Sequence, residues 1–181
     1  MNKLALIPMM VGLAVAYAAA QAPATQTAPA AVAPGARATL KDAQGKTLGE
    51  ATLRESPAGV LVKLDLQGVP PGPHAFHIHT VGKCDPPDFM TAGGHFNPTT
   101  MKHGLIAVGG PHAGDMPNLF VPADGKLSVE VLDSNVTLAA GQKSLFDADG
   151  SALMLHAMAD DYATDPAGAA GGRIACGVVT R

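Results

Sequence analysis

Apolar residues recur at every second position along several stretches of this chain, and that period of two constrains the fold more than any other feature. In residues 59–68, GVLVKLDLQG, four valine and leucine side chains fall on one face. Residues 126–133, KLSVEVLD, alternate in the same way. Such alternation is typical of strands that bury one face. No window of twelve residues carries the apolar stripe of an amphipathic helix. The pattern therefore predicts an all-β chain.

Turn residues separate the predicted strands. The chain of 181 residues contains 21 glycines and 15 prolines, which favours many turns over long helices. Hairpins are predicted around Gln44-Gly45 and around Asp124-Gly125, and residues 171–181, GGRIACGVVTR, are predicted to form a last strand. Short strands joined by glycine-rich turns indicate one domain built as a β-sandwich or barrel.

The first 35 residues are predicted to lie outside this domain. Lys3 precedes an uncharged run of 17 residues that ends in Ala18-Ala19-Ala20, an A-x-A cleavage pattern. We interpret residues 1–20 as a secretory signal peptide; the alternative is a retained membrane anchor, for which a run of this length is short. Residues 21–35 are uncharged and rich in Ala, Pro, Thr and Gln, so we expect a flexible linker. The domain is placed at 36–181.

Charge and cysteine content narrow the environment and the partners. The formal charge is −3, and it becomes −4 once Lys3, the only charged residue before Arg37, is removed. With no excess of basic residues, nucleic acid is not an expected partner. Cys84 and Cys176 are the only cysteines, and an even pair in an exported chain favours a disulfide bond.

Three of the seven histidines fall in residues 74–79, HAFHIH. If this stretch is a strand with Phe76 and Ile78 toward the core, His77 and His79 point together to the other side. Their Cα atoms are then roughly 6–7 Å apart, which lets two imidazoles reach one metal ion. His74 has the opposite parity and is not expected to join them.

A second group of possible ligands follows in residues 93–115. It comprises His95, His103, His112 and Asp115. Three imidazoles and one carboxylate form a ligand set of the kind that closes a structural zinc site. The segment is rich in glycine, and a bound metal would explain how so long a loop is ordered. His156, near a predicted strand end, could complete a set with His77 and His79.

Taken together, these segments resemble the copper/zinc superoxide dismutases, of the bacterial exported kind. The similarity covers about 36–181 and rests on AFHIHTVGKC, AGGHFNP, KHG, HAGDMPN, LHAMADD and GGRIACGVV, which occur in the family's order. The resemblance implies an eight-stranded Greek-key β-barrel or sandwich with long metal-binding and channel loops. It also implies one copper and one zinc per subunit, and the dismutation of superoxide to dioxygen and hydrogen peroxide by a copper centre that cycles between Cu(II) and Cu(I).

The resemblance also assigns roles to residues. Copper is expected at His77, His79, His95 and His156, and zinc at His95, His103, His112 and Asp115. His95 would bridge the two metals and deliver a proton. Arg173 would stand beside the copper channel, Asp160 would link a copper histidine to a zinc histidine, and Cys84 would pair with Cys176. The substrate is superoxide, and the expected location is the periplasm, the cell envelope or the exterior. No stable membrane span is expected, and a homodimer is left open.

One departure from the family concerns charge near the channel. Residues 157–172 contain no Lys or Arg, so attraction of the anionic substrate would depend on Arg173 and on lysines elsewhere, such as Lys83 or Lys102. Among rival readings, a metallo-β-lactamase would need an aspartate where Val81 stands. A cupin would need a glutamate a few residues after the histidine pair, and none follows the pair until position 130. A non-catalytic metal-binding module or copper carrier of the same fold is the remaining alternative.

Overall fold

The structure is a computed structural model that describes residues 35–181. The predicted signal peptide, and the predicted linker except Gly35, lie outside the described residues. The strands are β1 (Ala36–Asp42), β2 (Thr47–Ser56), β3 (Gly59–Gln67), β4 (Gly72–His74), β5 (Phe76–His79), β6 (Leu119–Val121), β7 (Lys126–Asp133), β8 (Ala152–His156) and β9 (Arg173–Val178). The one helical segment assigned in 35–181 is a 3₁₀ turn at Met90–Ala92. No helix in this range is long and apolar enough to cross a membrane.

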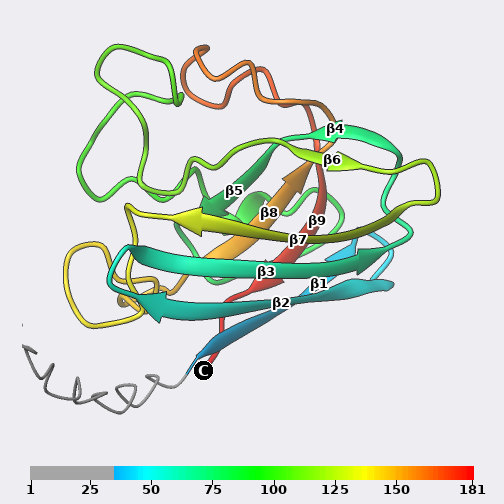
Figure 1. The fold of residues 1–181 in the computed structure, drawn as a ribbon, viewed down its shortest axis with the longest axis horizontal. Coiled ribbons are helices and arrows are strands. Elements are labelled where there is room, and N and C mark those ends of the chain that lie inside the picture. Colours follow the sequence, from blue (N-terminus) through cyan, green and yellow to red (C-terminus); the bar gives the residue numbers. More distant parts are fainter. Residues whose placement is uncertain (1–34) are drawn as a thin grey trace, which may run out of the picture. The chain divides into compact units, whose positions relative to one another are not determined.

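The strands form one large antiparallel sheet and one small one. The large sheet has the order β5-β8-β9-β1-β2-β3-β7, and β4 pairs with β6 in the small sheet. The large sheet curls, so that β1, β2, β3 and β7 make one layer and β5, β8 and β9 lie behind it in Figure 1. Side chains from both layers, such as Leu64 of β3 and Ile78 of β5, belong to a single buried core.

Strands β4 and β5 are separated by one residue, Ala75. The Ala75 N–H donates to Met158 O (2.8 Å), and Ala75 O accepts from His156 N (3.0 Å). The segment 72–79 is therefore one extended stretch that passes from the small sheet to the large sheet. Counted in this way, the fold has eight strands. Because β3 pairs with the later strand β7, and β1 with β9, the connections are of the Greek-key kind. The predicted all-β Greek-key fold is confirmed.

The alternation in the sequence corresponds to burial in the structure. On β3 the four valine and leucine side chains predicted to share a face are all buried, while Lys63 and Asp65 are exposed. The turn around Gly45 closes the predicted β1–β2 hairpin, with Gly45 N–H donating to Asp42 O (2.9 Å). Glycine suits this turn because its φ of 80° is unfavourable for other residues.

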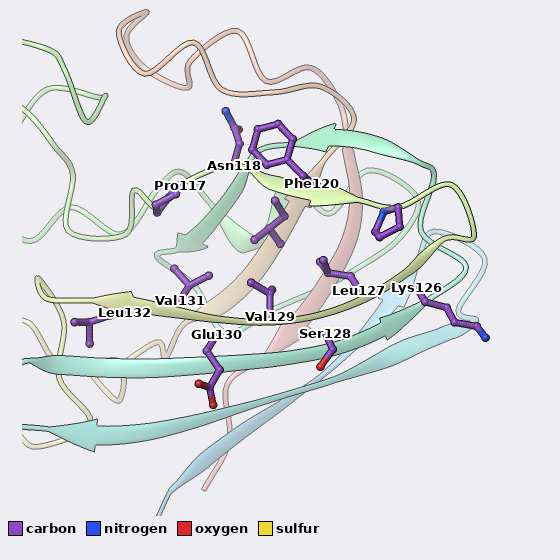
Figure 2. Close-up of a pocket in the computed structure, with 12 residues that line it drawn as sticks. Pro117, Asn118, Phe120, Lys126, Leu127, Ser128, Val129, Glu130, Val131 and Leu132 are labelled. Atoms are coloured by element: carbon purple, nitrogen blue, oxygen red, sulfur yellow. The ribbon is translucent and has the colours of Figure 1, made fainter.

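The second predicted hairpin is only partly correct. A turn does form, with Gly125 N–H donating to Pro122 O (2.9 Å). The strands it joins do not pair with each other, because β6 pairs with β4 and β7 pairs with β3. An apolar groove of about 600 Å³ lies between them. Figure 2 shows Phe120 on one side of this groove and Val129 and Val131 on the other.

Candidate metal centre

Strand β5 holds the first two site histidines. One edge of β5 pairs with β8, and at its other edge loop residues make backbone bonds with it: Ile78 N–H donates to Gly114 O (2.9 Å), and Phe96 N–H donates to Ile78 O (2.8 Å). These bonds bring residues 95–96 and 112–115 against the strand. As a result His77 and His79 are buried under the loop that carries the other candidate ligands. Their predicted parity is confirmed.

Four imidazoles meet in what we call the copper cluster. Its members are His77, His79, His95 and His156, all buried, with one ring nitrogen of each within 4.8 Å of the others. The remaining nitrogen of each ring is held elsewhere. His79 Nδ1 donates to Gly93 O (2.9 Å), so its Nε2 faces His156 Nε2 at 3.4 Å. In this cluster His77 Nδ1 and His95 Nε2 are buried without a hydrogen-bond partner. Unpaired buried nitrogens are rare, and these two suit a metal ion.

A second group, the zinc cluster, gathers around one carboxylate oxygen. It consists of His95, His103, His112 and Asp115. The Nδ1 atoms of His95, His103 and His112 lie 2.8, 3.1 and 3.3 Å from Asp115 Oδ1. Asp115 Oδ2 is engaged separately, because it accepts from the backbone N–H groups of Gly104 and His112. Three imidazole nitrogens and one carboxylate oxygen suit a tetrahedral zinc ion.

His95 belongs to both clusters. Its Nδ1 lies 2.8 Å from Asp115 Oδ1 in the zinc cluster. Its Nε2 is one of the two unpaired nitrogens of the copper cluster. The ring packs against that of His77, with centroids 4.0 Å apart. One imidazole therefore presents one nitrogen to each cluster.

Asp160 connects the clusters from outside. Its Oδ2 accepts from His77 Nε2 (2.8 Å), and its Oδ1 accepts from His103 Nε2 (3.0 Å). These bonds leave the Nδ1 atom of each ring for its own cluster. Carboxylates that bind the far nitrogen of a metal-ligating histidine fix its tautomer and orientation. The predicted place of Asp160 between His77 and His103 agrees with this geometry.

Burial gives three imidazoles of the copper cluster, those of His79, His95 and His156, low pKa values. Desolvation is the main cause, and it lowers the pKa of His79 to about 2, of His156 to about 3 and of His95 to about 4. These three rings are neutral at pH 7, so His79 and His156 can each bind a metal ion through one nitrogen without displacing a proton. His95 must lose its remaining N–H to offer a nitrogen to each cluster. Burial opposes the charged form of His103 too, but its hydrogen bonds to Asp115 and Asp160 outweigh burial and raise its pKa to about 9.

Arg173 lies beside the copper cluster at the start of β9, where it pairs with His156. Its guanidinium donates to Phe89 O and to Gly93 O, both at 2.6 Å. Gly93 O is also the acceptor for His79 Nδ1. The Arg173 guanidinium and the His79 imidazole thus share the Gly93 carbonyl oxygen as hydrogen-bond acceptor.

The predicted disulfide is confirmed. Cys84 and Cys176 are bonded, with Cα atoms 5.6 Å apart, and no free cysteine remains in residues 35–181. The bond joins the loop after β5 to β9. His74 takes no part in the clusters: its Nδ1 donates to His156 O and its Nε2 lies against Pro70 O, both at 2.8 Å. This agrees with its predicted parity.

Three residues around Asp160 were not identified from the sequence. Asn118 and Tyr162 bond to Asp160, and Gly168 lies so close that a Cβ there would be 1.8 Å from Asp160 Oδ1. Neither a repeated spacing nor a metal-binding residue type marks them. Asn118 lay within a quoted segment, HAGDMPN, but only its backbone and amide contacts reveal its place.

Comparisons with known proteins agree with this geometry. The family described as copper/zinc superoxide dismutase (SODC) matches residues 47–179. Superoxide dismutase (Cu-Zn) 1 of Aquifex aeolicus is 53% identical over 144 residues, which cover 78% of this chain and 85% of that protein. Superoxide dismutase (Cu-Zn) of Caulobacter vibrioides is 46% identical over 147 residues, covering 80% and 84%.

Solved structures show the same fold. The Cu/Zn superoxide dismutase from Brucella abortus superposes with a TM-score of 0.67 at 30% identity and covers 80% of this chain and 99% of its own. A SOD-like protein from Bacillus subtilis superposes with a TM-score of 0.76 at 38% identity, covering 78% and 96%.

Proposed function

Because the chain belongs to the copper/zinc superoxide dismutase family, it is a superoxide dismutase that uses copper and zinc, and we propose that its two histidine clusters divide these metals between them. The copper cluster binds copper and the zinc cluster binds zinc. The observation that carries this assignment is His95, which presents one nitrogen to each cluster. When bound, copper supplies the one-electron redox couple that turns two superoxide anions and two protons into dioxygen and hydrogen peroxide.

His95 is proposed to have a second role, as a proton carrier. Its Nε2 faces the copper cluster, where the reaction needs protons, and its Nδ1 stays toward the zinc cluster. Because the ring is buried and anchored at Nδ1, Nε2 can take up and release a proton without a change in ring orientation. Asp115, held by backbone N–H groups, supports the anchored side.

Arg173 is proposed to capture the substrate. Superoxide is an anion, and the protein is anionic too, so general attraction cannot bring it to the site. A fixed cation close to the copper cluster focuses the field over a Debye length of about 8–10 Å. The two carbonyl groups of Phe89 and Gly93 hold the guanidinium in place.

The assignment of metals is tested by comparing two alanine variants. His95→Ala removes a ligand from both clusters, so copper and zinc content should both fall. His156→Ala removes a ligand from the copper cluster alone, so copper should fall and zinc should stay near one per chain. Metal content by mass spectrometry and superoxide decay by stopped flow provide the measurements. Equal loss of zinc in the two variants would contradict the shared role of His95.

Export is proposed from the disulfide and from the predicted leader. Disulfides persist in oxidising compartments such as the periplasm, and Cys84 is bonded to Cys176. We propose that residues 1–20 are removed, that 21–35 form a linker and that 36–181 form the enzyme domain. Mass determination of the N-terminus of the mature protein from a periplasmic extract tests this; an intact Met1 there would contradict it.

A homodimer is proposed as the oligomeric state. Its support is the exposed apolar surface beside the groove between β6 and β7, where the Phe120 side chain is 72% exposed. Contiguous exposed apolar surface is typical of sites of protein association. Light scattering on the mature protein distinguishes the two states: a monomer at micromolar concentration would contradict the proposal.

A further inference from the structure

A closed ring of hydrogen bonds joins Asn118, Asp160 and Tyr162. The Asn118 side chain holds the backbone of Asp160: Asn118 Nδ2 donates to Asp160 O (2.9 Å), and Asp160 N–H donates to Asn118 Oδ1 (2.7 Å). The Tyr162 hydroxyl accepts from the Asn118 backbone N–H (2.7 Å), and the Tyr162 N–H donates to Asp160 Oδ1 (2.6 Å). Asp160 is therefore held at its backbone by Asn118, which is distant in sequence, and at its carboxylate by the N–H of Tyr162 in its own segment.

This ring of hydrogen bonds positions the Asp160 carboxylate, which bonds to one histidine of each metal cluster. Asp160 Oδ2 accepts from His77 and Oδ1 accepts from His103. The carboxylate is buried, with 4% of the residue exposed. A rotation of this group would turn one imidazole of each cluster at the same time. The position of Asp160 is thus a condition for the geometry of both clusters.

Tyr162 has an unusual backbone that serves this arrangement. Its φ is 63°, in the left-handed region that bulky residues seldom adopt. In this conformation its N–H points to the Asp160 carboxylate while its ring reaches back to Asn118. Its carbonyl accepts from Ile106 N–H (3.2 Å), in the loop that carries His103. Residues held in such conformations persist when their surroundings over-determine them, and they concentrate at functional sites.

We infer that Tyr162 is a positioning residue for both metal clusters, which acts through the bond between its hydroxyl and Asn118. Together with Asn118 it fixes the orientation of Asp160, and through Asp160 the rings of His77 and His103. The inference rests on the proposed division of copper and zinc between the clusters. It adds a residue that donates no ligand atom and contacts neither metal cluster's donor atoms.

The size of the expected effect follows from the length of this path. Removing a group bonded directly to a ligating histidine typically costs 10–100-fold in metal affinity. Two residues, Asn118 and Asp160, stand between the Tyr162 hydroxyl and the histidines. We therefore expect a loss of metal affinity at the lower end of that range, about tenfold. Removal of the hydroxyl leaves the Asn118 N–H without its acceptor. Asn118 then keeps its two side-chain bonds to Asp160 but loses the bond that fixes its own backbone.

Tyr162→Phe tests the inference because it removes only the hydroxyl. The matched control is Thr164→Val, which removes a hydroxyl from the same loop that bonds to Asp161 and not to the ring. Wild type and both variants are loaded with one copper and one zinc, and the loading is verified by metal analysis. Two quantities are then measured: the rate of zinc transfer to a chromophoric chelator, and the electron paramagnetic resonance spectrum of the Cu(II) form.

We expect Tyr162→Phe to release zinc about tenfold faster and to change the Cu(II) hyperfine splitting, whereas Thr164→Val matches the wild type in both. A lower melting temperature with both quantities unchanged would show a purely structural role and overturn the inference. In an Asn118→Ala background Tyr162→Phe should add little, and a full additional effect there would also overturn it. If the wild type itself fails to take up one copper and one zinc, the proposed assignment of the clusters fails instead.

Discussion

At the scale of single residues, the site depends on which nitrogen of each imidazole is already engaged. His77 gives its Nε2 to the Asp160 carboxylate and keeps Nδ1 for the copper cluster. His79 gives its Nδ1 to a backbone carbonyl and keeps Nε2. The same residue type thus offers opposite nitrogens because its outer partners differ, and those partners also fix which tautomer is present.

Arg173→Ala is expected to slow capture of superoxide without loss of metal. The substitution removes a cation that lies beside the copper cluster, and residues 157–172 contain no Lys or Arg to replace it. The second-order rate constant should fall about tenfold or more, which corresponds to ~1.4 kcal/mol of transition-state stabilisation per factor of ten. The rate constant of Arg173→Lys should lie between those of the wild type and of Arg173→Ala. Superoxide decay after pulse radiolysis measures the rate, and added salt should slow the wild type more than the alanine variant. A wild-type rate for Arg173→Ala at low salt would contradict the role of Arg173.

Asp133 is expected to make stability depend on pH. Its carboxyl is buried at the end of β7 with Oδ2 unpaired, and burial raises its pKa from 3.8 to about 7. Because the folded-state pKa is the higher one, this contribution to stability is complete below pH 3.8 and is lost as the pH rises to about 7.

Asp133→Asn should remove this dependence. Relative to the wild type, the variant should gain about 2 kcal/mol in free energy of unfolding between pH 5.5 and 7, at roughly 1.4 kcal/mol per pH unit. Urea unfolding of the metal-loaded proteins at the two pH values measures the difference. A constant difference between variant and wild type across this range would mean that Asp133 does not titrate there.

At the scale of elements, the disulfide connects the two parts that hold the guanidinium. Arg173 stands on β9, and its acceptors Phe89 and Gly93 lie in the loop after β5. The bond between Cys84 and Cys176 joins this loop to this strand. We therefore expect the disulfide to help fix the position of Arg173 as well as to stabilise the fold.

Replacing both cysteines by serine should affect stability and activity together. The chain-entropy model for a closed loop of this size gives about 4–5 kcal/mol, and the rate of superoxide decay should fall because the acceptors of Arg173 are less well fixed. Thermal unfolding and stopped-flow assays of the remetallated variant measure both effects. Full activity at an unchanged melting temperature would contradict this role of the disulfide.

At the scale of the whole molecule, regular structure and metal ligands are unevenly distributed. Between β5 and β6 the described chain forms no named strand and only a 3₁₀ turn, yet this segment contains His95, His103, His112 and Asp115. Strands β1, β2 and β3 contain no member of either cluster. Free energy of metal binding is therefore expected to stabilise the loops more than the sheet.

Removal of both metals should lower the melting temperature and expose the loops selectively. Hydrogen exchange measures this by segment: amides of residues 93–118 should lose protection, while amides of β2 and β3 should change little. The reason is that the sheet is held by its own ladder and by a core of buried Val and Leu side chains. An equal loss of protection in both regions would contradict this division.

The sequence by itself determined the class of fold and which residues gather in the two clusters. Period-two alternation predicted β3 and β7, since burial on one face of a strand follows from its geometry. The parity of residues 76–79 predicted that His77 and His79 lie together. The order of the motifs predicted the residues of both clusters, because that similarity depends on residue type and spacing.

Tertiary structure decided what depends on contacts between distant segments. The local sequence around Gly125 could not show whether β6 and β7 pair with each other, because their partners lie elsewhere in the chain: β6 pairs with β4, and β7 pairs with β3. Other features also depend on tertiary structure. The ring of hydrogen bonds needs Asn118 and Tyr162, which are 44 positions apart in sequence. The unpaired nitrogens and the burial of Asp133 need a closed core. Hydrogen bonding and desolvation act over a few ångströms in space, whereas sequence patterns report only spacing along the chain.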